Sequence, residues 1–109
     1  MASTYKVLAQ SAPSATTNTD VYTVGSGKSA VVSTITVCNR DSSAATYRIA
    51  VRPLGATIAN QHYIAYGAAV PANDTISLTL GVTLATTDVV TVYASTANLS
   101  FNIFGSEIA

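Results

Sequence analysis

Polar and apolar residues alternate along most of this chain, and that alternation predicts β-strands. In residues 33–38, Ser33, Ile35 and Val37 fall on one side of an extended run, while the residues between them, mostly threonine, fall on the other. Most of these side chains are β-branched or small, which favours strands over helices. The same period of two recurs in residues 46–52, 75–80, 90–93 and 99–103.

Clean alternation is typical of antiparallel sheets with one face in the core and one face outward. Segments rich in Gly, Pro, Asn, Asp and Ser separate the runs at residues 25–27, 39–43, 53–55, 71–74, 86–88 and 95–98. About seven or eight short strands at this spacing predict a β-sandwich of jelly-roll or immunoglobulin-like type. We expect one domain over residues 1–109, with a loop at 10–19 between strands at 5–8 and 21–24, and a strand near 63–65.

The segment GSGKS at residues 25–29 raises the question of a phosphate-binding loop. A Walker A motif requires a glycine five residues before Gly27, where this chain has Tyr22, and a helix after the loop, where this chain has a strand pattern. We therefore predict a hairpin turn, with Gly25 or Gly27 at positive φ and residues 21–24 paired with 30–38. Nucleotide hydrolysis is the weakest functional hypothesis.

Charge is unusually sparse. The 109 residues include five Lys and Arg and five Asp and Glu, so 9% are charged and the formal net charge is zero, while 49% are hydrophobic. The cations are scattered, which disfavours nucleic-acid binding. Mean hydropathy is +0.38, yet no uninterrupted apolar run approaches the length of a membrane-spanning helix. A near-neutral surface of Ala, Thr and Val favours association, so we expect a homo-oligomer or contacts with other proteins.

Catalytic, metal and cofactor sites are not indicated. Cys38 has no cysteine partner, and His62 is the sole histidine, so neither a zinc site nor a supported catalytic triad emerges. The four aspartates and Glu107 lack a calcium-loop spacing, and aspartates such as Asp41 and Asp74 fit turns that they cap. The N-terminal residues lack a secretion-signal pattern. We expect a non-enzymatic protein without cofactors.

Six tyrosines without tryptophan admit a sugar-stacking surface, although core or interface use is favoured. Tyr47 is expected to face inward and Tyr93 outward. The candidate contact surface combines the outward rows of the alternating runs with the loop around residues 62–66. Its members are Thr34, Thr36, His62, Tyr63, Tyr66, Thr75, Ser77 and Thr79.

From Tyr5 to Ile108 the chain resembles a family of small virion structural proteins of tailed bacteriophages, including phages of cyanobacteria. The phrases that carry the resemblance are IAVRP, HYIAY and DVVTVYAST. It implies a non-enzymatic subunit present in many copies in the virion and assembled in the host cytoplasm, with other virion proteins as partners. A capsid decoration or cement protein and a neck or tail protein both remain open. The alternative is a receptor- or glycan-binding module on a phage fibre or tail.

Overall fold

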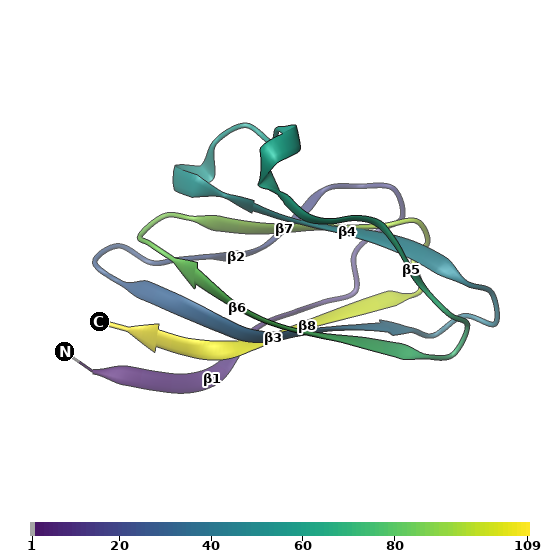
Figure 1. The fold of residues 1–109 in the computed structure, drawn as a ribbon, viewed down its shortest axis with the longest axis horizontal. Helices are drawn as coiled ribbons and strands as arrows, with labels where there is room; N and C mark the ends of the chain where they lie inside the picture. The colour runs from purple at the N-terminus through teal and green to yellow at the C-terminus, as the bar shows by residue number, and fades with distance from the viewer. Residues whose placement is uncertain (1) are drawn as a thin grey trace.

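The computed structural model describes residues 2–109 as two antiparallel sheets packed face to face (Figure 1). The elements are β1 (Ser3–Ser11), β2 (Thr19–Thr23), β3 (Ser29–Asn39), β4 (Ala45–Arg52), the 3-10 turns η1 (Pro53–Gly55) and η2 (Asn60–His62), β5 (Tyr63–Val70), β6 (Thr75–Leu84), β7 (Val89–Ala94) and β8 (Leu99–Ile108). The all-β sandwich expected from the sequence is confirmed.

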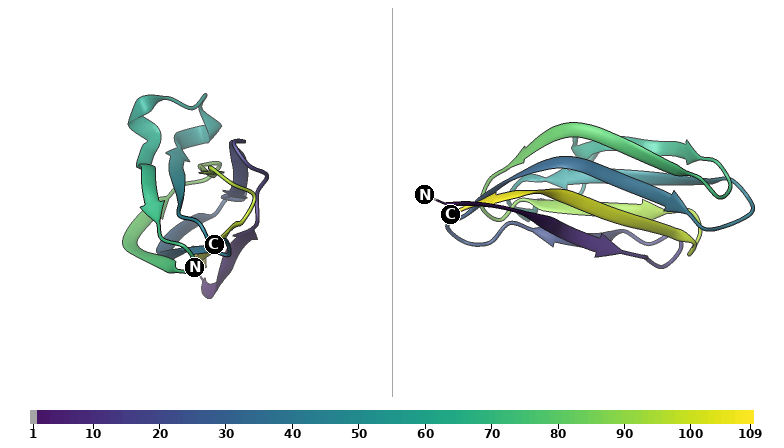
Figure 2. Two further views of the ribbon diagram at one scale, coloured as in Figure 1. Left: turned by 90° about the vertical axis from the view of Figure 1, so that its right-hand side faces the viewer. Right: turned by 90° about the horizontal axis from the view of Figure 1, so that it is seen from below.

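The strand order identifies the sandwich as a jelly roll. Sheet A has the order β1-β8-β3-β6 and sheet B the order β2-β7-β4-β5. The first half of the chain pairs with the second half in reverse, as β1 with β8, β2 with β7, β3 with β6 and β4 with β5. This is an antiparallel ribbon folded over itself, which is the jelly-roll arrangement rather than the immunoglobulin one. The two termini consequently lie side by side (Figure 2), and the amide of Ala109 bonds to the carbonyl of Ala2.

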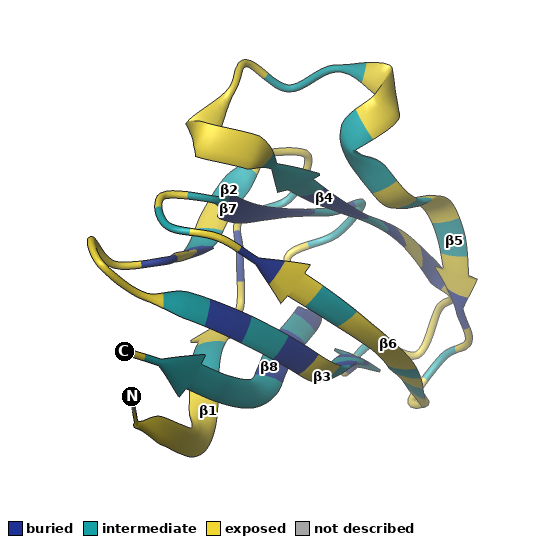
Figure 3. Ribbon diagram, turned by 60° about the vertical axis from the view of Figure 1, so that its left-hand side comes forward, coloured by how far each residue is buried: buried dark blue, intermediate teal, exposed yellow. Residues whose placement is uncertain are grey.

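The core lies between the sheets and follows the alternation in the sequence. In β8, Leu99, Phe101 and Ile103 are buried, whereas the residues between them are half-buried. In β4, Tyr47 and Ile49 face the core. The Tyr47 and Phe101 rings pack edge-to-face, with their centroids 6.4 Å apart. The predicted inward placement of Tyr47 is confirmed, and burial changes along the strands in bands (Figure 3).

The predicted hairpin between residues 21–24 and 30–38 is wrong. Strand β2 pairs with β7 in sheet B, whereas β3 pairs with β6 and β8 in sheet A, so the intervening turn crosses from one sheet to the other. Two consecutive amphipathic strands can bury their apolar sides by facing each other across a core as well as by pairing, and the local pattern is the same in both cases. Gly27 does have a positive φ of 73°, as the turn chemistry predicted.

A β-bulge changes the phase of β3. The register with both neighbouring strands shifts between Val32 and Thr34, so Ser33 is exposed instead of sharing the core side with Ile35. The shift also affects the paired strand β6, where Leu80 is 48% exposed although the alternation placed it with Ile76 and Leu78. In β3 the extra residue inverts the facing, so that Val32 and Ile35 are both buried, which a strict period of two does not anticipate. In β6 the facing is not inverted, because Val82 and Leu84 stay on the side of Ile76 and Leu78.

The turns follow the predicted chemistry. Asp41, Asp74 and Asp88 each accept a hydrogen bond from a nearby backbone amide, of Ser42, Thr75 and Ala85 respectively. Asp20 instead pairs with Arg52 at 2.9 Å. The expected loop at residues 10–19 is shorter than predicted, because β1 continues through Ser11 and β2 begins at Thr19.

One charged group links the two sheets at the end near the termini. Glu107 of β8 pairs with Lys6 Nζ at 2.7 Å and accepts a hydrogen bond from the Tyr22 hydroxyl at 2.6 Å. The hydrogen bond from Lys6 and then that from Tyr22 lower the pKa of Glu107, while burial and this bond raise the pKa of Tyr22. The carboxylate therefore holds β1, β8 and β2 together in its ionised form.

Acid should weaken this link. A carboxyl group whose folded pKa is depressed stabilises the fold above its unfolded pKa of about 4.3, and that contribution is lost as the pH falls through the folded value. We expect Glu107→Gln to lose less stability between pH 7 and pH 3 than the wild type does, as measured by the urea midpoints; the remaining loss comes from the other carboxylates, such as Asp41, whose pKa is lowered by hydrogen bonds from Asn98 and Ser42. Lys6→Met should reduce the pH dependence because it removes the largest cause. An equal acid sensitivity in Glu107→Gln and wild type would contradict this role.

Candidate functional site

The outer face of sheet A carries no charge along its rows of cross-strand neighbours. The register aligns three rows across β1, β8, β3 and β6. Their members are Gln10, Asn102, Thr36 and Ser77; Val7, Phe104, Thr34 and Thr79; and Tyr5, Ser106, Val31 and Thr83. We call these twelve residues the neutral face. A sheet surface of this extent without a single ionised side chain has little to oppose contact with another protein.

The five predicted contact residues on β3 and β6 lie together on the neutral face or at its margin. Thr34 pairs with Thr79 and Thr36 with Ser77, and Thr75 lies two pairs further on, opposite Cys38. Threonines 34 and 36 are half-buried, and the residues on β6 are exposed. These residues lie together because β3 pairs with β6. The sequence predicts the two strands but not that they are neighbours.

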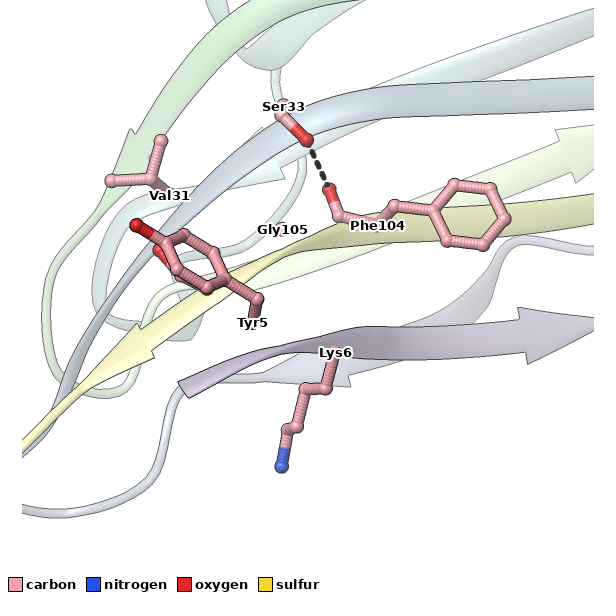
Figure 4. Close-up of a pocket in the computed structure, with 7 residues that line it drawn as sticks. Tyr5, Lys6, Val31, Ser33, Phe104 and Gly105 are labelled. Carbon is pink, nitrogen blue, oxygen red and sulfur yellow. Dashed lines mark hydrogen bonds between the residues drawn. The ribbon is translucent and has the colours of Figure 1, made fainter. Parts of the chain in front are cut away.

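A shallow apolar groove opens at one end of the neutral face. It has a volume of about 380 Å³ and is lined mainly by Tyr5, Val31, Phe104 and Gly105. Figure 4 shows the Tyr5 ring beside Val31, while the Lys6 side chain points away from it. The Ser33 hydroxyl at the bulge donates to the Phe104 carbonyl oxygen at 3.2 Å. Tyr5 is 86% exposed, so a large aromatic ring stands at the surface with little of its area covered.

Strand β6 forms one edge of sheet A, and its first half, Thr75–Thr79, lacks the usual protection against strand pairing. Its sequence, TISLTLGVTL, has neither a charged residue nor a proline over ten residues. Natural edge strands are commonly blocked by lysine, proline or a bulge, and here the sole irregularity lies around Leu80 and Gly81. The stretch from Thr75 to Thr79 remains a regular edge with unpaired backbone groups.

The other predicted contact residues lie on β5 of sheet B or in the turn η2 that leads into it. His62 ends η2, and its Nδ1 accepts a hydrogen bond from the Ala59 amide at 3.0 Å, so it caps its own turn. Tyr63 and Tyr66 lie on β5, with ring centroids 4.8 Å apart and ring planes at 84°. The predicted surface thus separates into two, one on each sheet.

Tyr66 belongs to a row that the sequence analysis missed. Arg48 on β4 is aligned with Tyr66 of β5 on one side and with Tyr93 of β7 on the other. Its guanidinium carbon lies 4.3 Å from the Tyr66 ring centroid and 4.1 Å from that of Tyr93. Alternation predicted that Arg48 and Tyr93 face outward, but strand order was needed to make them neighbours.

The surface beside this row is hollowed. Asn60, Tyr63 and Tyr66 line a depression of about 370 Å³. Tyr66 is 63% exposed, and Asn60 is exposed at the start of η2. The planes of the two rings are almost perpendicular to each other. We call Asn60, Tyr63, Tyr66, Arg48 and Tyr93 the aromatic patch.

Within residues 2–109, no three His, Cys, Asp or Glu side chains come together in a group able to hold a metal ion. The described part of the chain also contains no helix long and apolar enough to cross a membrane. Lys28, the cation of the GSGKS segment, is exposed at a turn that leads into a strand, and its amide bonds back to the Gly25 carbonyl. That geometry offers no helix N-terminus for a phosphate.

Comparison with protein-family models, with curated proteins and with solved structures found no match.

Proposed function

We propose that the protein is a non-enzymatic structural subunit of a tailed-phage virion, as a capsid decoration or cement protein or as a neck or tail protein. It self-associates and contacts other virion proteins through the neutral face and the adjoining edge of β6. The observation that carries the proposal is the absence of charge on all twelve residues of that face. Dense packing of many copies requires surfaces that neither repel one another nor retain bound water strongly.

The fold is compatible with this role. Eight-stranded jelly rolls occur in viral capsid proteins and also in lectins. Fold alone does not decide function, and the uncharged surface of sheet A is therefore the decisive feature. The resemblance to small virion proteins adds the phage context, and the uncharged edge of β6 adds a means by which copies can meet through backbone hydrogen bonds.

Ser77→Lys should reduce self-association at least tenfold, an effect of about 1.4 kcal/mol. The substitution places a charge on the neutral face and on the edge strand, where lysine opposes pairing. Light scattering of the purified chain over a range of concentrations measures the association.

Ser14→Lys is the matched control, because it adds the same charge to an exposed connection between β1 and β2. It should associate like the wild type. A wild-type chain that stays monomeric at high concentration, or equal weakening by both substitutions, would contradict the proposed contact surface. Mass spectrometry of purified particles tests the phage assignment, since a virion subunit must be present in the particle fraction.

A saccharide-binding module on a phage fibre or tail is the second candidate. The specific observation in its favour is the aromatic patch, where the exposed Tyr66 and the half-buried Tyr63 lie beside the Asn60 side chain in a hollow. Aromatic rings stack on the apolar faces of sugars, and amides bind their hydroxyl groups. This surface is on sheet B, so it leaves the neutral face of sheet A free.

A further inference from the structure

We infer that the aromatic patch binds an acidic saccharide, with the sugar ring against Tyr63 and Tyr66 and its carboxylate on Arg48. The inference rests on the second candidate function and names its ligand class. A hollow of about 370 Å³ lies within the range of small-molecule sites and suits one or two sugar units.

Arg48 supplies the charge selectivity. Of the arginines, Arg52 pairs with Asp20, and Arg40 donates to Ser100 and to the Ala97 carbonyl. Within residues 2–109, Arg48 has no carboxylate at ion-pair distance; two tyrosine rings flank it instead. A guanidinium held by rings keeps its position while its N–H donors stay available to a carboxylate, which it can bind through two parallel bonds.

Sheet geometry makes the aromatic patch rigid. The row runs across three hydrogen-bonded strands, with Arg48 on β4 between β5 and β7. Asn60 and Tyr63 are fixed beside it because η2 leads directly into β5, and His62 caps that turn through the Ala59 amide. A binding surface that is already ordered loses less conformational entropy when a ligand binds.

The sharpest probe compares a trimer of galacturonic acid with its methyl ester, which has the same rings but no charge. We expect the acid to bind at least about tenfold more tightly, as one charge-assisted hydrogen-bonded pair provides. Titration of the full-length ¹⁵N-labelled chain by NMR gives both affinities and the affected residues. Raising the salt concentration should weaken binding of the acid and leave the ester unchanged.

Variants assign the two parts of the site. Arg48→Met retains the length of the side chain and should abolish the preference for the acid while leaving weak binding of both trimers. Tyr66→Ala should weaken both trimers about equally. Lys28→Met and Tyr5→Ala are the matched controls, since they remove a charge and an exposed tyrosine elsewhere on the surface. If Arg48→Met does not fold, Arg48→Lys should retain part of the preference.

The outcomes separate the proposals. Equal affinity for the acid and the ester overturns the acidic ligand. A preference for the acid that survives in Arg48→Met overturns the role of Arg48, and in both cases the saccharide module stands. NMR chemical-shift changes confined to residues outside the aromatic patch overturn the site. Failure to bind either trimer removes both the inference and the second candidate, and the structural-subunit proposal is then judged by its own association measurements.

Discussion

Gly105→Ala is expected to lower the free energy of unfolding by about 3 kcal/mol, the upper end of the range for forcing extra atoms into a packed interior. A Cβ at this position would overlap the Val31 carbonyl oxygen and lie 3.0 Å from Val32 Cα. These are backbone atoms of β3, at the bulge where that strand crosses close to β8, so no side chain can rotate away. Relief would require the two central strands of sheet A to separate.

Urea denaturation followed by circular dichroism measures this loss. The matched control is Gly25→Ala, because a Cβ there meets only the Lys28 side chain at an ordinary 3.6 Å, and Gly25 is outside the positive-φ group. That variant should stay within about 0.5 kcal/mol of the wild type. Equal stability of the two variants would show that β3 and β8 are farther apart at the bulge than the structure has them. Since Gly105 also lines the groove beside Tyr5, its loss should disturb the neutral face.

Asn39→Asp is expected to cost about 3 kcal/mol or more at pH 7, because it leaves an unpaired buried charge among acceptors. The Asn39 side chain is buried, and its Nδ2 donates to the carbonyl oxygens of Ser43, Val70 and Pro71 at 2.9–3.3 Å. An aspartate has nearly the same shape, but its carboxylate oxygen would face these three carbonyls. The change therefore tests hydrogen bonding without creating a cavity.

The pH dependence identifies the cause. A carboxyl group surrounded by acceptors is favoured in its protonated form, which can donate, so its folded pKa lies above its unfolded value. Stability of the variant should be greatest below the unfolded pKa, about 3.9, and should be lost as the pH rises through the folded value. Urea midpoints at pH 3 and pH 7, compared with those of the wild type, measure the difference.

Asn18→Asp provides the control, since Asn18 is exposed in the connection between β1 and β2. The same chemical change there should leave stability within about 0.5 kcal/mol. A loss in Asn39→Asp that does not recover toward pH 3 would mean that the three carbonyls are not its cause. Asn39 also accepts from the Asp41 amide at 2.9 Å, so it orders the turn after β3 and the connection between β5 and β6 together.

The roles of Asn39 and Gly105 do not follow from the pattern of polar and apolar residues. The residue types around Asn39 predict a turn, but in the structure Asn39 is 1% exposed and joins segments about thirty residues apart. Nothing in the sequence around Gly105 indicates its close contact with β3, because that contact depends on a bulge in the other strand. In both cases the decisive neighbour is remote in the sequence, and alternation of polar and apolar residues carries information about facing but none about which strand lies alongside.

The candidate surfaces divide in the same way. Alternation of polar and apolar residues predicts the outward facing of Thr34, Thr36, Thr75, Ser77 and Thr79. The Asn, Asp, Gly and Pro residues between the runs predict the turns that separate the two strands carrying them. That Thr34 meets Thr79, or that Arg48 lies between Tyr66 and Tyr93, required the register. The separation of Tyr63 and Tyr66 from the threonine rows follows from their membership of different sheets.

The all-β class of the domain, its turns and most of its core can be predicted from the sequence, because side-chain facing and turn chemistry are local properties of the chain. Tertiary structure alone decided the jelly-roll order, which places residues 21–24 and 30–38 in opposite sheets. Burial of an amphipathic strand is satisfied equally by a partner beside it or across the core, so the choice depends on how all eight strands pack together. The same packing placed uncharged rows on sheet A and a row of one arginine between two tyrosines on sheet B.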